Sequence, residues 1–181
     1  IGCFSKEAYA FIDWLKEAGQ TYWQILPIHP TSYGDSPYQS FSTFAGNPYF
    51  IDLEELIEEG MLTREECDSM DFGDDEDDID YEDQYQNRYI LLTMAYERSN
   101  ISQNPDYQRF VEENRWWLDD YALFMALKTF FNGQCWNEWP QDIRLRWGYS
   151  MDYYRRELYF DIEFQMFLQY WFFKQYWRLK A

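Results

Sequence analysis

Aromatic, hydroxyl and amide side chains alternate closely in residues 26–49, where the sequence has most scope for chemistry. The segment reads Leu-Pro-Ile-His-Pro-Thr-Ser-Tyr-Gly-Asp-Ser-Pro-Tyr-Gln-Ser-Phe-Ser-Thr-Phe-Ala-Gly-Asn-Pro-Tyr. This mixture suits a sugar, because aromatic rings lie against the C–H faces of a pyranose while its hydroxyls need directional donors and acceptors. We predict that the ligand contacts are Tyr33, Ser36 and Tyr38. Three other aromatic residues are expected to pack the loop down: Phe41, Phe44 and Tyr49.

The chain has few of the histidine and cysteine residues that other catalytic sites and metal sites require. His29 is the only histidine, so a Ser-His-Asp triad or a histidine metal site would depend on that one residue. We expect His29 to be structural. The cysteines Cys3, Cys67 and Cys135 are odd in number, widely spaced and without a Cys-x-x-Cys pair. The sequence therefore predicts no metal site, no cofactor, and reduced thiols in a cytoplasmic protein.

The charge balance excludes several classes of partner. The chain has 181 residues, of which 33 are acidic and 15 basic, giving a net charge of −18. Such a charge argues against general electrostatic binding of nucleic acid or of an anionic membrane. No apolar run reaches the roughly 18–20 residues needed to cross a bilayer. Aromatic residues make up 23% of the chain, which is ample for a core and excludes wholesale disorder.

The acidity is concentrated between Asp52 and Gln86, where 17 residues are acidic and one is basic. Blocks of like charge repel one another and stay solvated, so residues 71–80 are predicted to form an exposed loop between helices. A calcium site is one alternative, although Ile79 stands where an EF-hand loop requires glycine. Its oxygen ligands would be Asp74, Glu76 and Asp78. An acidic interaction surface at residues 71–83 is the other alternative.

Helix caps and apolar spacing predict a mostly helical chain around the loop. The predicted helices are one between Ser5 and Gly19, residues 53–59, a short helix capped by Thr63 and Glu66, 81–98, 105–131 with a break near Trp116, and about 151–180. Residues 21–26 are rich in β-forming side chains, stop at Pro27 and are predicted to be a strand. A lone strand has no partner for its backbone groups, so we expect a larger α/β protein. The loop follows this strand, and ligands of parallel α/β folds bind at the carboxyl ends of strands.

Residues 34–49 resemble the signature loop of the 4-α-glucanotransferases, which are also called amylomaltases or disproportionating enzymes. The resembling segment is Gly-Asp-Ser-Pro-Tyr-Gln-Ser-Phe-Ser-Thr-Phe-Ala-Gly-Asn-Pro-Tyr. The likeness continues in residues 19–27, 117–127 and 136–140, in Gln169-Tyr170 and in 172–175. It therefore covers nearly the whole chain, and the acidic run is its least characteristic part.

The resemblance implies a fold class and an activity. The parent would be an α/β enzyme with a (β/α)8 TIM barrel, and this chain would be an N-terminal fragment, mostly α-helical with few strands. Residues 1–50 would form the early part of the barrel with the substrate loop, 51–150 a helical insertion subdomain, and 151–181 a long helix returning to the barrel. Such enzymes transfer α-1,4-glucan segments between maltooligosaccharides by a retaining double displacement, without metal or organic cofactor.

The same resemblance implies roles for the three predicted contacts. Tyr38 would stack on a sugar ring and Ser36 would hydrogen-bond a sugar hydroxyl, while Tyr33 would belong to an aromatic glucan-contact surface nearby. The family's catalytic carboxylates lie in later segments, including Arg-Ile-Asp-His and Thr-His-Asp, which are absent here. Asp35 is the only acid in the loop, and one carboxylate without a partner does not supply a retaining mechanism. The chain is therefore expected to carry substrate-binding residues, no catalytic residue, and no activity on its own.

Two further expectations concern the isolated chain. It could be a stand-alone remnant that holds maltooligosaccharides through Tyr33 and Tyr38 without catalysis. A cut barrel also exposes strand edges and apolar surface, which favours self-association. We expect either a dimer or a compact helical subdomain with a frayed barrel portion.

Overall fold

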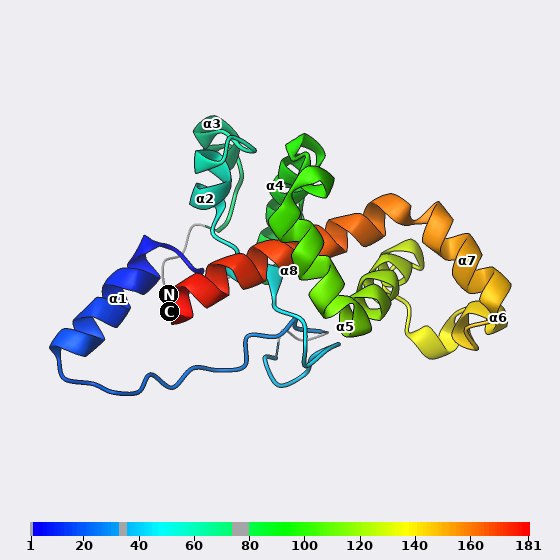
Figure 1. Ribbon diagram of the computed structural model, residues 1–181, viewed down its shortest axis with the longest axis horizontal. Helices are drawn as coiled ribbons and strands as arrows, with labels where there is room; N and C mark the ends of the chain where they lie inside the picture. Colours follow the sequence, from blue (N-terminus) through cyan, green and yellow to red (C-terminus); the bar gives the residue numbers. More distant parts are fainter. Residues whose placement is uncertain (1, 33–35, 74–79) are drawn as a thin grey trace. The chain divides into compact units, whose positions relative to one another are not determined.

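The computed structural model describes residues 2–32, 36–73 and 80–181, and apart from one isolated β-bridge the regular elements within these ranges are helices joined by loops (Figure 1). The contacts between residues divide it into two compact units. Unit 1 comprises Ile1–Ser102 and Gln169–Ala181, and unit 2 comprises Gln103–Leu168. The predicted assignment of residues 1–50 and 151–181 to a barrel, and of 51–150 to an insertion, stays a prediction.

Unit 1 packs short helices and one end of a long helix around a mixed aliphatic and aromatic core. Its elements are α1 (Lys6–Glu17), η1 (Pro48–Phe50), α2 (Leu53–Glu58), α3 (Arg64–Asp68), α4 (Tyr81–Arg98) and the C-terminal part of α8 (Tyr159–Lys180). The side chains of Ile51, Leu56 and Leu91 are fully buried. Phe4 adds three ring contacts, with Phe50, Phe172 and Tyr176, at centroid distances of 5.2–5.9 Å. This core holds the segment that follows the candidate loop.

Unit 2 is built around the long helix α5 (Pro105–Phe130). Its other elements are η3 (Trp136–Glu138), α6 (Gln141–Arg144), α7 (Gly148–Glu157) and the N-terminal part of α8, and η2 (Ile101–Gln103) lies at the border between the units. The buried face of α5 includes Leu118, Ala122 and Leu127. None of the helices in the described parts of the chain is long and apolar enough to span a membrane.

Local capping explains several helix boundaries and confirms the sequence predictions at these points. Asn104 caps α5 by accepting hydrogen bonds from the backbone N–H groups of residues 106 and 107, and proline follows it. Thr63 and Glu66 form a reciprocal capping box at α3. Gly19 has φ +74°, the left-handed conformation expected of the residue that ends α1.

Three predictions about secondary structure are wrong. Residues 21–26 form no strand, because no neighbouring strand among the described residues pairs with their backbone groups. The predicted break near Trp116 is absent, and α5 runs on without a glycine or proline to interrupt it. The predicted helix 151–180 is instead two helices, α7 and α8, separated at Leu158, whose side chain is buried at the turn.

The acidic segment is described only at its two ends. Asp71 accepts a hydrogen bond from the N–H of Gly73 at 2.9 Å, and Asp80 caps α4. The predicted calcium ligands Asp74, Glu76 and Asp78 lie outside the described residues, as does most of the predicted loop.

Candidate functional site

The two ends of the candidate loop are held together at its base. The backbone N–H of Asn47 donates to the carbonyl oxygen of Ile28 at 2.9 Å. The Nδ1 atom of His29 lies 3.0 Å from the carbonyl oxygen of Ala45. Since a carbonyl oxygen can only accept, Nδ1 carries the proton in this contact. The single histidine therefore has the structural role that the sequence predicts, because it joins the beginning of the loop to the leg that returns through Ala45.

The tip of the loop is a tight turn. Thr31 and Ser40 form an isolated antiparallel bridge, and the N–H of Ser32 donates to the oxygen of Gln39 at 3.1 Å. The N–H of Gln39 also donates to the oxygen of Ser36 at 3.0 Å, which closes a four-residue β-turn. Proline at the second position of this turn has the φ angle that the turn requires.

This turn brings together two of the three predicted ligand contacts, Ser36 and Tyr38. Tyr38 has 74% of its surface exposed, so its ring is open to solvent. Ser36 is half-buried, and its Oγ accepts from the backbone N–H of Tyr38 over 3.4 Å, which is long for a hydrogen bond. Tyr33, the third predicted contact, and Asp35 lie outside the described residues.

The aromatic residues expected to pack the loop down do so unequally. Phe44 is 53% exposed and Phe41 is 36% exposed, so neither ring is buried, and their packing role stays a prediction. Tyr49 is half-buried, and its ring centroid lies 6.4 Å from that of Tyr81. Serine hydroxyls hold the backbone here instead: the Oγ of Ser42 accepts from the N–H groups of residues 44 and 45 at 3.1 and 3.2 Å. Such local serine turns could have been predicted from the Ser-x-Ser-x-Phe spacing.

The segment that follows the loop is fixed by buried polar groups. The guanidinium of Arg88 donates to the carbonyl oxygen of Ile51, and burial lowers the pKa of Arg88. Burial raises the pKa of the Asp52 carboxyl and of the Cys3 thiol, whose Sγ lies 3.9 Å from Asp52 Oδ1. These groups anchor the backbone after the loop. No group of three potential metal ligands lies together in the described part of the chain.

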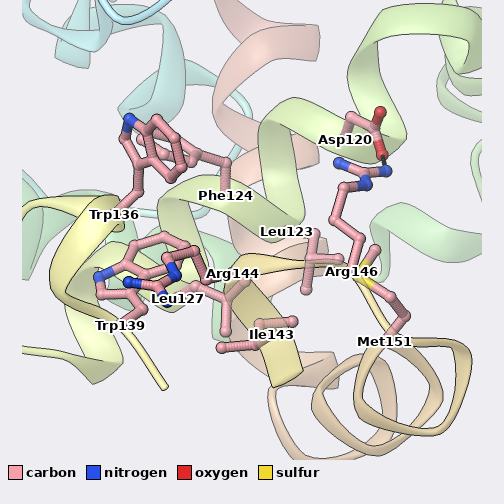
Figure 2. A pocket seen from close by; sticks show the side chains of 10 residues that line it. All are labelled: Asp120, Leu123, Phe124, Leu127, Trp136, Trp139, Ile143, Arg144, Arg146 and Met151. Carbon is pink, nitrogen blue, oxygen red and sulfur yellow. Dashed lines mark hydrogen bonds and ion pairs between the residues drawn. The ribbon is translucent and has the colours of Figure 1, made fainter. Parts of the chain in front are cut away.

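Unit 2 contains a separate cleft of about 330 Å³ that the sequence analysis did not predict (Figure 2). Figure 2 shows Trp136 and Phe124 on one side and Arg146 reaching toward Asp120 on the other; the Arg146 Nη2 to Asp120 Oδ1 distance is 2.7 Å. Arg146 follows α6 with φ +56°, a left-handed conformation that usually belongs to glycine at this position. The two residues lie 26 positions apart, so no local signal in the sequence indicates this pair.

A family model described as 4-alpha-glucanotransferase matches residues 1–181, and the chain belongs to this family. It is 48% identical over 180 residues to a 4-alpha-glucanotransferase from Clostridium butyricum, covering 99% of this chain and 37% of that protein. It is 42% identical over 185 residues to a 4-alpha-glucanotransferase from Thermus thermophilus, covering 100% of this chain and 36% of that protein. The chain thus spans little more than a third of the length of these relatives.

A solved structure is similar over the same extent. It is described as an amylomaltase from Streptococcus agalactiae in complex with acarbose, and it matches with a TM-score of 0.91 and 37% identity. The match covers 99% of this chain and 37% of that one. These comparisons confirm the family that residues 34–49 resemble.

Proposed function

We propose that this chain is the substrate-binding part of an enzyme that transfers α-1,4-glucan segments between maltooligosaccharides by a retaining double displacement. The observation that carries the proposal is the turn of residues 36–39, which presents the exposed ring of Tyr38 beside Ser36. Membership of the 4-alpha-glucanotransferase family supports it, as does the likeness to an amylomaltase that was solved with acarbose.

In this proposal each loop residue has a distinct role. Tyr38 stacks on a sugar ring, Ser36 accepts or donates a hydrogen bond at a sugar hydroxyl, and Tyr33 adds an aromatic contact nearby. The nucleophile and the acid/base carboxyl lie on segments outside this chain, in a complete (β/α)8 barrel that uses no metal or organic cofactor. A cytoplasmic location and self-association of the chain stay predictions, and sedimentation of the purified chain tests the second.

Calorimetric titration with maltoheptaose tests the role of Tyr38. Tyr38→Ala is expected to weaken binding by about 2- to 10-fold, the value of an aromatic stacking contact. Tyr38→Phe is the matched control, because it keeps the ring and removes the hydroxyl, and it should bind like the parent. Equal affinity of Tyr38→Ala and the parent would contradict the assignment.

Turnover of maltotriose distinguishes part of a glucan-transferring enzyme from a stand-alone binding remnant. We expect the 181-residue chain to leave maltotriose unchanged, and a chain extended to the length of its relatives to release glucose and longer oligomers. Turnover of maltotriose by the 181-residue chain would show that catalytic groups are present here. An inactive extended chain that still binds maltoheptaose would favour the binding remnant.

A further inference from the structure

We propose that Gln169 is a positioning residue for the glucan-binding loop, and that its side-chain amide holds the returning leg of the loop on α8. The inference rests on the proposed function of residues 36–38. It adds a residue that lies 123 positions away from Gly46 of the loop in the sequence.

The side chain of Gln169 is fully buried and makes two hydrogen bonds to one residue of the loop. Its Oε1 accepts from the backbone N–H of Gly46 at 2.8 Å, and its Nε2 donates to the carbonyl oxygen of Gly46 at 3.0 Å. The amide therefore occupies the place that a peptide group of a neighbouring strand would take in a sheet. A buried amide without such partners would carry a large desolvation cost, so the pairing is specific.

Gly46 lies between two residues that are each hydrogen-bonded to the beginning of the loop. Its neighbour on one side, Ala45, has its carbonyl oxygen bonded to His29, and its neighbour on the other side, Asn47, bonds to the oxygen of Ile28. Fixing Gly46 therefore fixes the base from which the turn carrying Ser36 and Tyr38 extends. Releasing Gly46 would let both legs move.

A second glutamine provides an internal comparison. Gln175 is also fully buried, and its amide bonds to both backbone groups of Asp52, with Oε1 accepting at 2.7 Å and Nε2 donating at 3.2 Å. The chemistry is the same, but Asp52 lies beyond η1 and outside the loop. Loss of Gln175 should loosen Asp52 and leave the loop in place, whereas loss of Gln169 should loosen the loop.

The test compares Gln169→Met with Gln175→Met, since methionine has a similar shape but cannot make either hydrogen bond. Amide hydrogen exchange and acarbose affinity are measured on the same proteins. Gln169→Met should speed exchange at Gly46 by about 10- to 100-fold, as expected for the loss of two hydrogen bonds. It should also speed exchange at Gln39, because the base of the loop is released, and should weaken acarbose binding by about 5-fold or more. Gln175→Met should speed exchange at Asp52 and keep acarbose affinity within about 2-fold of the parent.

A conservative variant separates positioning from general stability. Gln169→Glu keeps the acceptor for the N–H of Gly46 and, while its carboxyl is protonated, a donor for the carbonyl oxygen, so at low pH its acarbose affinity should lie between those of the parent and Gln169→Met. If Gln169→Met does not fold, Gln169→Glu against Gln175→Glu provides the same comparison.

Two results would overturn the proposal. One is faster exchange at Gly46 with unchanged exchange at Gln39 and unchanged acarbose affinity, because the contact would then be structural only. The other is an equal loss of affinity in the Gln169 and Gln175 variants. If the parent chain does not bind acarbose, the proposed function fails, and exchange at Gln39 then decides the positioning role alone: faster exchange in Gln169→Met supports it and unchanged exchange refutes it.

Discussion

The ring of Phe172 occupies the space that a side chain at Gly46 would need. A Cβ placed on Gly46 would lie 2.0 Å from Cδ1 of Phe172, far inside van der Waals contact. Phe172 is itself almost fully buried, so the ring has little room to move away. The returning leg of the loop can therefore approach α8 closely only because residue 46 has no side chain.

Gly46→Ala is expected to destabilise the protein by about 1–3 kcal/mol, because the methyl group overpacks a buried ring. Denaturant unfolding of the variant and the parent measures the difference. Gly148→Ala is the matched control, since no atom lies within 4 Å of a Cβ at Gly148, which begins α7. Alanine should be neutral or stabilising there. An equal loss of stability in both variants would show that the Phe172 contact is not the cause.

Glu66 should make stability depend on pH in the acid range. Hydrogen bonds from Arg98, at 2.8 and 2.7 Å, lower the pKa of Glu66 from 4.5 to about 2. Its contribution to stability is therefore present above the unfolded-state pKa of about 4.5 and is lost as the pH falls towards 2. Glu66→Gln should flatten the dependence of the denaturation midpoint on pH between about 5 and 2.

The control for Glu66 is Glu113→Gln, an exposed position on α5. This variant should keep the slope of the parent across the same range of pH. A Glu66→Gln protein with the parent's slope would mean that the ion pair with Arg98 does not persist in solution.

Two glutamates that share one lysine should differ in their contribution to stability, because only one of them is buried. Lys174 Nζ lies 3.5 Å from Glu55 Oε1 and 3.1 Å from Glu59 Oε1, and Arg178 also binds Glu55. The side chain of Glu55 is 9% exposed and that of Glu59 is 51% exposed. Glu55→Gln is expected to cost about 1–3 kcal/mol, because it leaves two cations beside a neutral buried group, whereas Glu59→Gln should cost less than about 0.5 kcal/mol. Equal effects on the free energy of unfolding would contradict this order.

The two tryptophans that line the cleft of unit 2 should differ in the same way. Trp139 is 6% exposed, and its ring packs against Phe124 and Phe131 at centroid distances of 5.6 and 5.4 Å. Trp139→Ala should cost about 3–5 kcal/mol, the usual range for a buried aromatic residue. Trp136 is 55% exposed, and Trp136→Ala should change stability by less than about 1 kcal/mol. Thermal unfolding of the two variants compares them, and a larger loss at Trp136 would refute the assignment.

Much of the helical structure was predictable because its signals are local. The bounds of α4, the N-terminus of α5 and the capping box of α3 each depend on residues within four positions of one another. The turn that carries Ser36 and Tyr38 is likewise formed by their own neighbours, whereas the role of these residues in binding stays a prediction. The prediction of a strand at residues 21–26 was wrong because β-propensity cannot supply the partner strand that its backbone groups need.

Residue types over short spans specify the family, the helix caps and the turn that carries Tyr38. The groups that hold this turn in place come from distant parts of the chain and become visible in the folded molecule. The pairing of Gln169 with Gly46 joins residues 123 positions apart, and the exposure of Phe44 depends on what packs against it. Such contacts have no local signature, because hydrogen bonding and packing across a fold depend on where distant segments meet.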